Sequence, residues 1–440
     1  MTKCKPFQKI FQVTKSRTLD ISFNGGDITS DAGIIMLRAL AEKLGLTEEI
    51  DPILSKYDHR NPASIEHNAI SMFMQRVYAI ACGYEDLNDH SDIDDDILMQ
   101  TILQKDGRLA SPSTLCRYEK NANRELNAEL SNVIVENFIK SHKSAPKELI
   151  LDFDATDSII HGTQEGRFFN GFYENYCYLP LYIFCENQLL VAYLRPSNID
   201  GAKHSWAILS LLVKRFREQW PDVRIIIRAD SGFCRHKMLN WCESNNVGYI
   251  IGIPSNPRLD RLSNDLSLKV KFDYETSLEN QKQFTEFLYA AETWTHPRRI
   301  ITKCEYNSLG PNTRYIVTNL EGDSEYLYSK VYCARGDMEN RIKEQQLDLF
   351  ADRTSSHAFQ TNQFRLLLSA FAYVLLERLR TLVLKGTEFA NAQCNTIRLK
   401  LLKIGAVIRC NTRKIYISLS SAYAYKNTFL SILNQIVVLR

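Results

Sequence analysis

The sequence predicts an α/β protein in which a mixed β-sheet flanked by helices follows a helical region and is interrupted by a β-rich insertion. Three observations predict this architecture. Apolar residues recur at helical spacing in the first 145 residues. Strand-like and helix-like segments then follow one another over residues 146–254, and alternating strand-like segments fill residues 255–322.

In the N-terminal region, apolar residues between Ile34 and Leu44 recur every three or four positions, which is the spacing of one helix face. A later segment, SPSTLCRYEK, places Ser111 as the N-cap of a short helix that carries Arg117 and Lys120. This helix either enters a DNA major groove as a recognition helix or is a short surface helix without a partner.

Residues 146–254 show the segment order of a ribonuclease H-like domain. Three strands are expected first, in KELILDFDATD and in two strands over residues 176–196 that join at a turn of residues 186–188. Helices and strands then alternate, with a helix at 204–220, a strand at 223–233, a helix at 234–246 and a strand at 247–254. This order predicts a mixed sheet with helices packed on it.

The remaining segments complete the sheet and cover it. Strands are expected at KVKFDY, QFTEFLYAAETW, RRIITKCEY and TRYIVTNL, with turns between residues 307 and 312. Helices are expected at residues 324–350 and 359–384, of which the second is apolar enough to cover one face of the sheet. One or two strands and a closing helix are expected near the C-terminus.

The composition excludes several classes of protein. With 45% apolar and 24% charged residues, the chain is neither disordered nor fibrous. No uncharged stretch reaches the ~20 residues that cross a bilayer, and the N-terminus lacks a signal-peptide core. Eleven cysteines without a C-x-x-C pair argue against a disulfide framework or a zinc ribbon and favour a cytosolic protein.

The net charge of +3 conceals a strongly basic C-terminal part. Between Arg353 and Arg440 there are thirteen Lys or Arg and only two acidic residues, Glu377 and Glu388, a balance of +11. Such a segment suits a polyanion, although a solvated helical surface is the other interpretation.

Four acidic residues are candidates for chemistry. Asp152 and Asp154 alternate along one strand and therefore share a face, and Asp230 ends a buried strand at the edge where α/β domains bind ligands. Glu339 lies in a helical segment with Arg335 four residues before it and Lys343 four residues after it.

Such acids from two strands and a helix can hold two Mg²⁺ ions for in-line phosphoryl displacement. The structural alternative is that each Asp caps a turn and that Glu339 forms solvated ion pairs with its helical neighbours.

Four segments resemble the DDE transposases of bacterial insertion sequences: LDFDATDSIIHG, NGFYENYCYLPLYIF, IIIRADSGF and YCARGDMENRIKE. Within that class the chain is most similar to the insertion-sequence-thirteen-eighty family. The resemblance covers nearly the whole chain, including SPSTLCRYE, NQFRLLLSAFAYVLL and TIRLKLLKIGA.

The resemblance implies Asp154, Asp230 and Glu339 as the catalytic and metal-binding triad, with Arg335 and Lys343 as catalytic cations. Asp154 is preferred because related motifs place Thr or Ser two positions later, where Thr156 stands, and Asp152 is the rival ligand or a helper.

Tyr332, Arg335 and Glu339 match the spacing of the final motif of related enzymes, but Gln346 stands where that motif has Lys. Lys343, one turn after Glu339, is the available replacement.

The resemblance also implies a cofactor, partners and a place in the cell. Two Mg²⁺ ions, replaceable by Mn²⁺, support cleavage at transposon ends and attack of the freed 3′-hydroxyl on target DNA. The partners are double-stranded DNA, at the ends and at the target, and further copies of the chain in a homodimer or larger multimer on DNA, in a bacterial cytoplasm at the nucleoid. The residues assigned to DNA are Arg117, Lys120, Trp294, Arg298, Arg299, Tyr332, Arg409, Arg413 and Lys414.

The expected domains follow the same division. They are a DNA-end-binding helical domain (1–145), the first part of the ribonuclease H-like core (146–254), the β-rich insertion (255–322), the second part of the core with the helix of Glu339 (323–385) and a basic C-terminal region (386–440). Two other functions remain open: a DNA-binding protein without catalysis that derives from a transposase, and a nuclease that does not join DNA.

Overall fold

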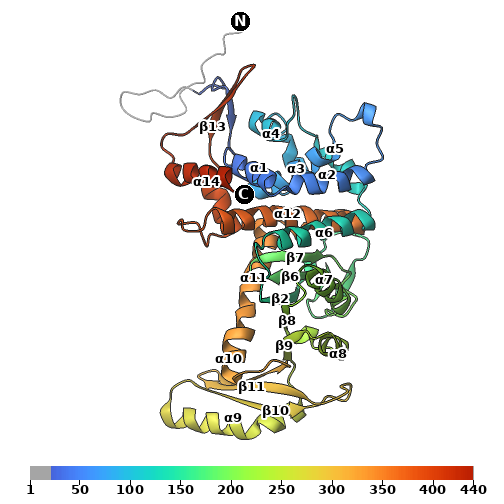
Figure 1. The fold of residues 1–440 in the computed structure, drawn as a ribbon, viewed down its shortest axis with the longest axis vertical. Helices are drawn as coiled ribbons and strands as arrows, with labels where there is room; N and C mark the ends of the chain where they lie inside the picture. Colours follow the sequence, from blue (N-terminus) through green and yellow to red (C-terminus); the bar gives the residue numbers. More distant parts are fainter. Residues whose placement is uncertain (1–20, 440) are drawn as a thin grey trace.

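The computed structural model describes residues 21–439 and is built around an eight-stranded mixed sheet (Figure 1). Its strands stand in the order β10-β11-β12-β9-β8-β2-β6-β7. Their bounds are β2 Glu148–Ala155, β6 Leu181–Cys185, β7 Gln188–Tyr193, β8 Arg224–Ala229, β9 Gly248–Ile253, β10 Gln281–Tyr289, β11 Arg298–Asn307 and β12 Gly310–Thr318.

The predicted mixed sheet is confirmed, and its pairing fixes where the acids stand. β2 pairs with β8, and β8 with β9, in parallel, whereas β2–β6 and β6–β7 are antiparallel. The first strand predicted over residues 176–196 is divided, because β5 (Asn175–Tyr178) leaves the large sheet and forms a small one with β3 (Ser158–Ile159) and β4 (Phe168–Asn170).

The two faces of the large sheet are covered by different helices. Side chains such as Leu151 and Ile227 pack with α7 (Ser205–Gln219) and α8 (His236–Ser244). Ile226 and Ile250 point the other way and pack with Leu327 and Tyr328, in the helical segment 324–348. Because side chains alternate along a strand, Asp152, Asp154 and Arg228 face this second side.

The segment 324–348 is helical, as predicted, but its hydrogen bonding changes along its length. It runs through α10 (Ser324–Tyr326), a π-helical stretch η4 (Leu327–Tyr332), a 3₁₀ turn η5 (Cys333–Arg335), α11 (Gly336–Lys343) and a second π-helical stretch η6 (Glu344–Asp348). π-Helical turns are rare and concentrate at functional sites.

The insertion differs from its prediction. KVKFDY lies inside a 21-residue helix, α9 (Pro257–Ser277), and does not form a strand. Asn256 caps this helix by accepting from the amides of Arg258 and Leu259, and Pro257 occupies its first turn. The three following strands, β10–β12, form as predicted, and β12 joins them to β9, so they extend the large sheet.

The N-terminal helices and the C-terminal part share one apolar core with α12 (Phe359–Leu382), which lies between the helices of residues 34–82 and the sheet, with the helix of residues 124–140 beside it (Figure 1). The predicted helix at residues 359–384 is thereby confirmed, and its Tyr373 ring packs on Phe184 of β6. The N-terminal helices are α1 (Ile34–Lys43), α2 (Leu46–Tyr57), α3 (Ala69–Cys82), α4 (Ile97–Ile102), α5 (Pro112–Lys120) and α6 (Arg124–Lys140).

The C-terminal part returns to the N-terminal region. The predicted strands and closing helix are present as β13 (Ala406–Cys410), β14 (Ile415–Leu419) and α14 (Lys426–Val438), preceded by the short α13 (Cys394–Ile397). β13 pairs with β1 (Asp27–Thr29). None of the helices in residues 21–439 has the length and apolar character needed to span a membrane.

Candidate active site

Asp154 and Asp230 lie side by side at the C-terminal ends of two parallel strands. Phe153 on β2 stands opposite Ala229 on β8, so the next residue on each strand is one of the two aspartates. Carboxyl ends of parallel strands are where α/β sheets bind ligands. The register therefore turns two acids 76 positions apart in the sequence into one acidic pair.

Arg335 connects this pair to Glu339. Its Nη1 lies 3.5 Å from Oδ2 of Asp154, and its Nη2 donates to Oε1 of Glu339 at 3.0 Å. The i,i+4 spacing of Arg335 and Glu339 places both on one side of the helical segment, which faces Asp154. Arg335 thus contacts two of the three acids, and the third, Asp230, lies beside Asp154 through the register of the strands.

The Asp154 carboxyl is in an environment that disfavours its charge. Burial is the main cause that raises its pKa to about 7; Arg335 opposes the rise, and repulsion from Asp230 and Glu339 adds to it. A carboxyl with this pKa holds a proton over much of the neutral range unless a cation compensates the charge. Carboxyl groups with pKa values raised in this way are frequent at functional sites.

Asp230 also has a structural role. Its Oδ1 accepts from the amide of Gly232 at 2.9 Å and caps the short turn of residues 231–233, as the turn-capping alternative predicts. Within residues 21–439 its Oδ2 accepts no hydrogen bond and is available to a ligand.

Tyr332 packs onto β9 beside Asp230. A Cβ on Gly252 would stand 2.7 Å from the Tyr332 hydroxyl oxygen and 3.0 Å from the amide nitrogen of Ser231. Only glycine therefore allows the tyrosine to approach this closely. The ring sits at the base of the site, where Asp230 contributes to the raised pKa of its hydroxyl after the larger effect of burial.

Asp152 forms an ion pair with Arg228. Both carboxylate oxygens accept from that guanidinium, Oδ2 from Nη2 at 2.7 Å, and Asp152 is only 2% exposed. Arg228 also donates from Nη1 to the carbonyl of Val331 at 2.6 Å. This rival ligand thus lies behind the acidic pair, within the contact between sheet and helix.

Within residues 21–439, no three His, Cys, Asp or Glu side chains form a ready-made metal site. The donor set nevertheless fits a divalent oxygen-binding cation, because Asp154 and Asp230 are adjacent carboxylates. Glu339 is half-exposed and, among residues 21–439, pairs with Arg335 alone, so its carboxylate is not fixed by the core.

Lys343 and Gln346, the two candidates for the last position of the motif, have different surroundings. Lys343 is exposed and makes no ion pair within the described part of the chain. Gln346 donates from its amide to the carbonyl of Asp157 at 2.9 Å, in the loop after β2. Gln346 therefore holds the segment 324–348 to the strand of Asp154 without supplying a charge.

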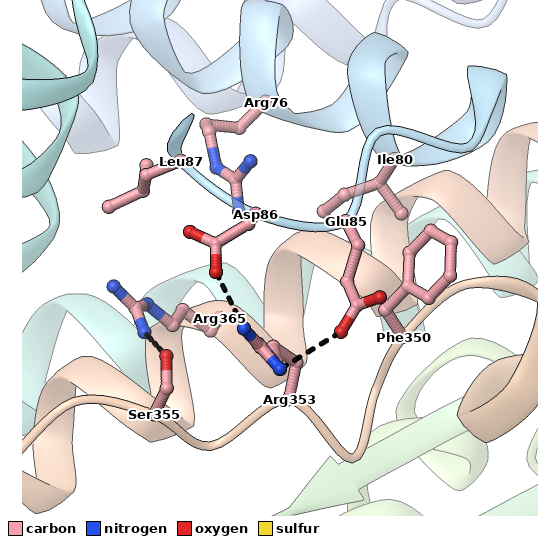
Figure 2. A pocket seen from close by; sticks show the side chains of 9 residues that line it. All are labelled: Arg76, Ile80, Glu85, Asp86, Leu87, Phe350, Arg353, Ser355 and Arg365. Carbon is pink, nitrogen blue, oxygen red and sulfur yellow. Dashed lines mark hydrogen bonds and ion pairs between the residues drawn. The ribbon is translucent and has the colours of Figure 1, made fainter. Parts of the chain in front are cut away.

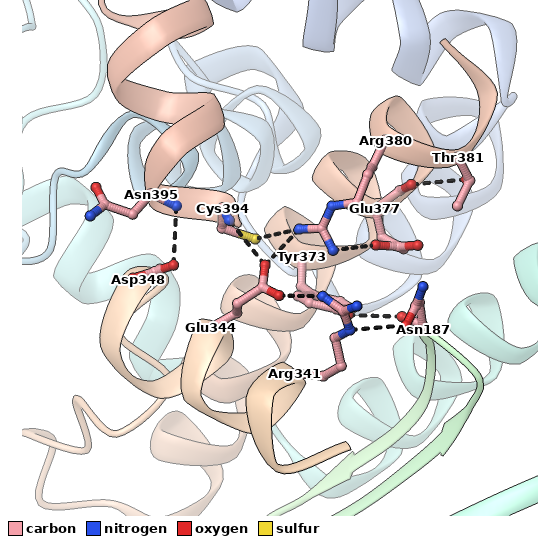
Figure 3. Close-up of polar contacts among 10 residues, drawn as sticks. All are labelled: Asn187, Arg341, Glu344, Asp348, Tyr373, Glu377, Arg380, Thr381, Cys394 and Asn395. Atoms are coloured by element: carbon pink, nitrogen blue, oxygen red, sulfur yellow. Dashed lines mark hydrogen bonds and ion pairs between the residues drawn. The ribbon is translucent and has the colours of Figure 1, made fainter. Parts of the chain in front are cut away.

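A buried polar network anchors the segment 324–348 to α12 and α13 (Figure 3). Glu344 accepts from Arg341 at 2.6 Å, from Arg380 at 2.6 Å and from the amide of Cys394 at 2.9 Å. Arg380 also pairs with Glu377, whose pKa burial raises to about 7. These contacts fix the helix of Glu339 to α12 and α13.

The candidate recognition helix is present as α5. Ser111 caps it by accepting from the amide of Thr114, as predicted, and Leu115 and Glu119 are buried on its inner side. Arg117 and Lys120 are exposed on the outer side. These two cations are therefore free to meet a polyanion.

The cations of the insertion are not free. Arg298 is buried, with its Nε 2.7 Å from Oε1 of Glu243 and its guanidinium 5.0 Å from the ring centre of Trp294. Arg299 pairs with Glu286 and donates to the carbonyl of Leu320 at 2.7 Å. Trp294 is partly buried against Tyr289. We therefore leave Arg298 and Arg299 out of the DNA-binding set proposed below.

Much of the C-terminal positive charge is neutralised inside the protein. Arg353 pairs with Glu85 at 3.3 Å and with Asp86 at 2.6 Å, in a small pocket beneath α3 (Figure 2). The others so engaged are Arg365 with Glu119, Arg380 with Glu344 and Glu377, and Lys403 with Asp31, while Arg398 donates to the carbonyls of Ile80, Ala81 and Asp348. The balance of +11 therefore overstates the basic surface.

Three exposed cations lie together on one hairpin, while Lys385, Lys400 and Lys426 are exposed elsewhere in the C-terminal part. Arg409 is exposed on β13, and Arg413 and Lys414 are exposed in the turn before β14. They keep the role expected of them as phosphate-binding candidates.

Sequence reasoning missed Arg228 and Tyr173. Arg228 stands two residues before Asp230, and its charge inside an otherwise apolar strand was the available signal. Tyr173 donates its hydroxyl to the carbonyl of Ala155 at 3.1 Å, next to Asp154, and no local pattern indicated this contact.

Comparison with known proteins gives one family. No curated protein matches the chain. Among solved structures, the cryo-EM structure of a piggyBac transposase synaptic complex with hairpin DNA matches with a TM-score of 0.41 and 11% identity, over 84% of this chain and 79% of that chain. The family model described as "Transposase DDE domain group 1" matches residues 11–440, and the chain therefore belongs to the DDE transposases of this group.

Proposed function

We propose that this chain is the transposase of a bacterial insertion sequence, of the insertion-sequence-thirteen-eighty family, which cleaves DNA at terminal inverted repeats and joins the 3′ ends to target DNA. One observation supports it above all: Asp154 and Asp230 end adjacent parallel strands, and Arg335 ties Asp154 to Glu339. The strand order β7-β6-β2-β8-β9, with β2, β8 and β9 parallel, supports assignment of these strands to a ribonuclease H-like core.

Asp154, Asp230 and Glu339 would hold two Mg²⁺ ions, or Mn²⁺ in their place, which stabilise the charge on the attacking and leaving oxygens of a phosphodiester. Arg335 keeps Asp154 and Glu339 close to each other in the free protein. The Arg228–Asp152 pair holds the two strands and the helical segment together behind the acids.

The proposed partner is double-stranded DNA at the transposon ends and at the target, bound by a homodimer or larger multimer at the bacterial nucleoid. Arg117 and Lys120 lie on α5, a capped helix that would enter a groove of the DNA. Arg409, Arg413 and Lys414 present charge to phosphates on a separate hairpin. Tyr332 and Trp294, both partly buried, are secondary candidates.

The experiment compares Mg²⁺-dependent DNA cleavage by the wild type and by Asp154→Asn, Asp230→Asn and Glu339→Gln. Each variant should lose cleavage and keep DNA binding, because a metal ligand and not a phosphate contact is removed. Asp337→Asn, an exposed acid on the same helix, is the matched control and should cleave normally. Full cleavage by any of the three would reject the triad. DNA binding by a wild type that never cleaves would identify the non-catalytic alternative.

A further inference from the structure

An exposed aromatic hairpin lies next to the acidic pair and has no role in the site described above. We define it as residues 167–176, which include β4, a turn at Gly171 and the start of β5. Its large exposed side chains are Phe168, Phe169, Phe172 and Tyr176. Phe172, at the turn, is 86% exposed, and Phe169 is 56% exposed. Exposed rings in such number are costly unless they meet a ligand.

The hairpin is held beside β2, the strand that carries Asp154. The chain leaves β2 at Ala155 and enters the small sheet at Ser158, and the amide of Ile160 donates to the carbonyl of Tyr176 at 2.8 Å. Tyr173, next to Phe172, donates to the carbonyl of Ala155. Burial and then the charges of Asp157, Asp154 and Asp230 raise the pKa of the Tyr173 hydroxyl to about 12, which agrees with its closeness to both acids.

The rings of the hairpin meet in edge-to-face pairs and not in face-to-face stacks. Phe169 and Tyr176 meet edge to face with centres 5.5 Å apart, and Phe172 meets Tyr173 in the same way at 4.9 Å. Phe169 and Phe172 stay largely exposed in this arrangement and are accessible to a further planar group.

A cation accompanies the rings. The Arg167 guanidinium carbon stands 3.9 Å from the centre of the Tyr176 ring, and its Nε is buried without a hydrogen-bond partner in the described part of the chain. Arg167 also makes no ion pair with any residue in the range 21–439. A guanidinium held on an aromatic face and not neutralised by a carboxylate complements a phosphate.

We propose that the aromatic hairpin binds unpaired nucleobases of a DNA strand entering the active site, by stacking them on Phe169 and Phe172 while Arg167 meets the backbone. This inference rests on the proposed DNA substrate and adds a site for single-stranded DNA. Every base has a flat π-face, so aromatic platforms beside a cation bind single strands without needing a particular sequence. A second copy of the chain is the less suitable occupant, because a stable protein interface needs roughly 800 Å² per partner and polar Glu174 and Asn175 separate these rings.

The test is a fluorescence titration of the full chain, without divalent cation, against a single-stranded oligonucleotide of about 16 nucleotides that contains 2-aminopurine. A blunt duplex of the same sequence is titrated in parallel. Phe172→Ala and Phe169→Ala should each weaken single-strand binding roughly 5- to 100-fold and change duplex binding by less than about twofold. Phe172→Trp, which keeps an aromatic ring at this position, should bind the single strand as the wild type does. Phe272→Ala, a 67% exposed ring on α9, is the matched control and should behave as the wild type.

Three results would overturn the inference. The first is equal single-strand affinity in all variants, and the second is no single-strand binding by the wild type. The third is a wild-type dimer that Phe172→Ala dissociates in light scattering while single-strand affinity is unchanged, which would assign the hairpin to self-association. Because the titration contains no metal, loss of the triad assignment in the cleavage assay and loss of this inference are separate outcomes.

Discussion

Arg228 donates to both carboxylate oxygens of Asp152, and this buried ion pair stands two residues before Asp230 on one strand and two residues before Asp154 on the other. The same guanidinium donates to the carbonyl of Val331 at the start of the Tyr332–Glu339 segment. One side chain thus touches all three elements that carry the acids. The geometry of the Arg228 guanidinium, and not its charge alone, positions these three elements.

Arg228→Lys should therefore impair the site more than it impairs the fold. A lysine keeps the positive charge but lacks the planar fork with which Arg228 donates to both oxygens of Asp152 and to the carbonyl of Val331. We expect the Mg²⁺ or Mn²⁺ concentration for half-maximal cleavage to rise about tenfold or more. Arg298→Lys, at a second buried arginine–carboxylate pair, is the control and should lower thermal stability without changing the metal requirement. A metal requirement unchanged in Arg228→Lys would assign the pair to stability alone.

The pKa of about 7 at Asp154 predicts a pH dependence of both metal binding and stability. Metal binding needs the carboxylate, so Mn²⁺ affinity measured by electron paramagnetic resonance should fall as the pH drops below about 7. Without metal, the folded state holds a proton that the unfolded chain, with a pKa near 3.8, has released. The stability from this group is complete below pH ~4 and is lost as the pH rises through 7.

Asp154→Asn should therefore lessen the loss of unfolding free energy between pH 5 and pH 8 in the absence of metal. Glu377, with a pKa also raised to about 7, contributes in the same direction and is unaffected by that substitution. Urea unfolding at the two pH values measures the difference. An identical loss in the variant and the wild type would show that Asp154 is ionised throughout.

Arg335→Ala and Lys343→Ala should have different effects. Arg335 bridges two carboxylates and offsets their charge, so its loss should weaken cleavage strongly and raise the pKa of Asp154 further. Lys343 has no ion pair in residues 21–439, so its substitution should change the melting temperature little. If Lys343 contacts DNA, cleavage falls in Lys343→Ala at unchanged stability; normal cleavage would remove Lys343 from the catalytic set.

Glu344→Gln should destabilise the protein strongly. It removes one partner from a buried cluster of two arginines and an amide, and breaking such a pair costs about 3–5 kcal/mol. Chemical denaturation measures this free energy. Glu325→Gln, at an exposed pair with Lys282, is the control and should cost less than about 1 kcal/mol.

Neutralising Arg409, Arg413 and Lys414 together should weaken binding to transposon-end DNA and to random DNA alike. Each lost phosphate contact should reduce the slope of log affinity against log salt by about 0.9. Filter binding or anisotropy over a series of salt concentrations gives the slope. Lys269→Ala with Lys271→Ala, on the distant α9, removes charge elsewhere and should leave the slope nearly unchanged.

The local patterns of the sequence correctly predicted most elements of the sheet and the acids at their ends. Alternation of apolar residues and strand-end carboxylates are properties of the segment itself, so β2, β8 and the helix of Glu339 could be read directly. KVKFDY shows the limit of such reading, because its short alternation was outweighed by a cap at Asn256 and by a long stretch free of further Gly or Pro.

The tertiary structure alone decided which of these residues act together. The parallel register of β2 and β8 placed Asp154 beside Asp230 and gave Asp152 to Arg228. Long-range pairing likewise decided which charges are neutralised, since Arg353 meets Asp86 across 267 positions, whereas Arg409, Arg413 and Lys414 make no ion pair within residues 21–439. A charge is available to a ligand only if no partner in the fold has taken it, and those partners come from distant segments that no local pattern can identify.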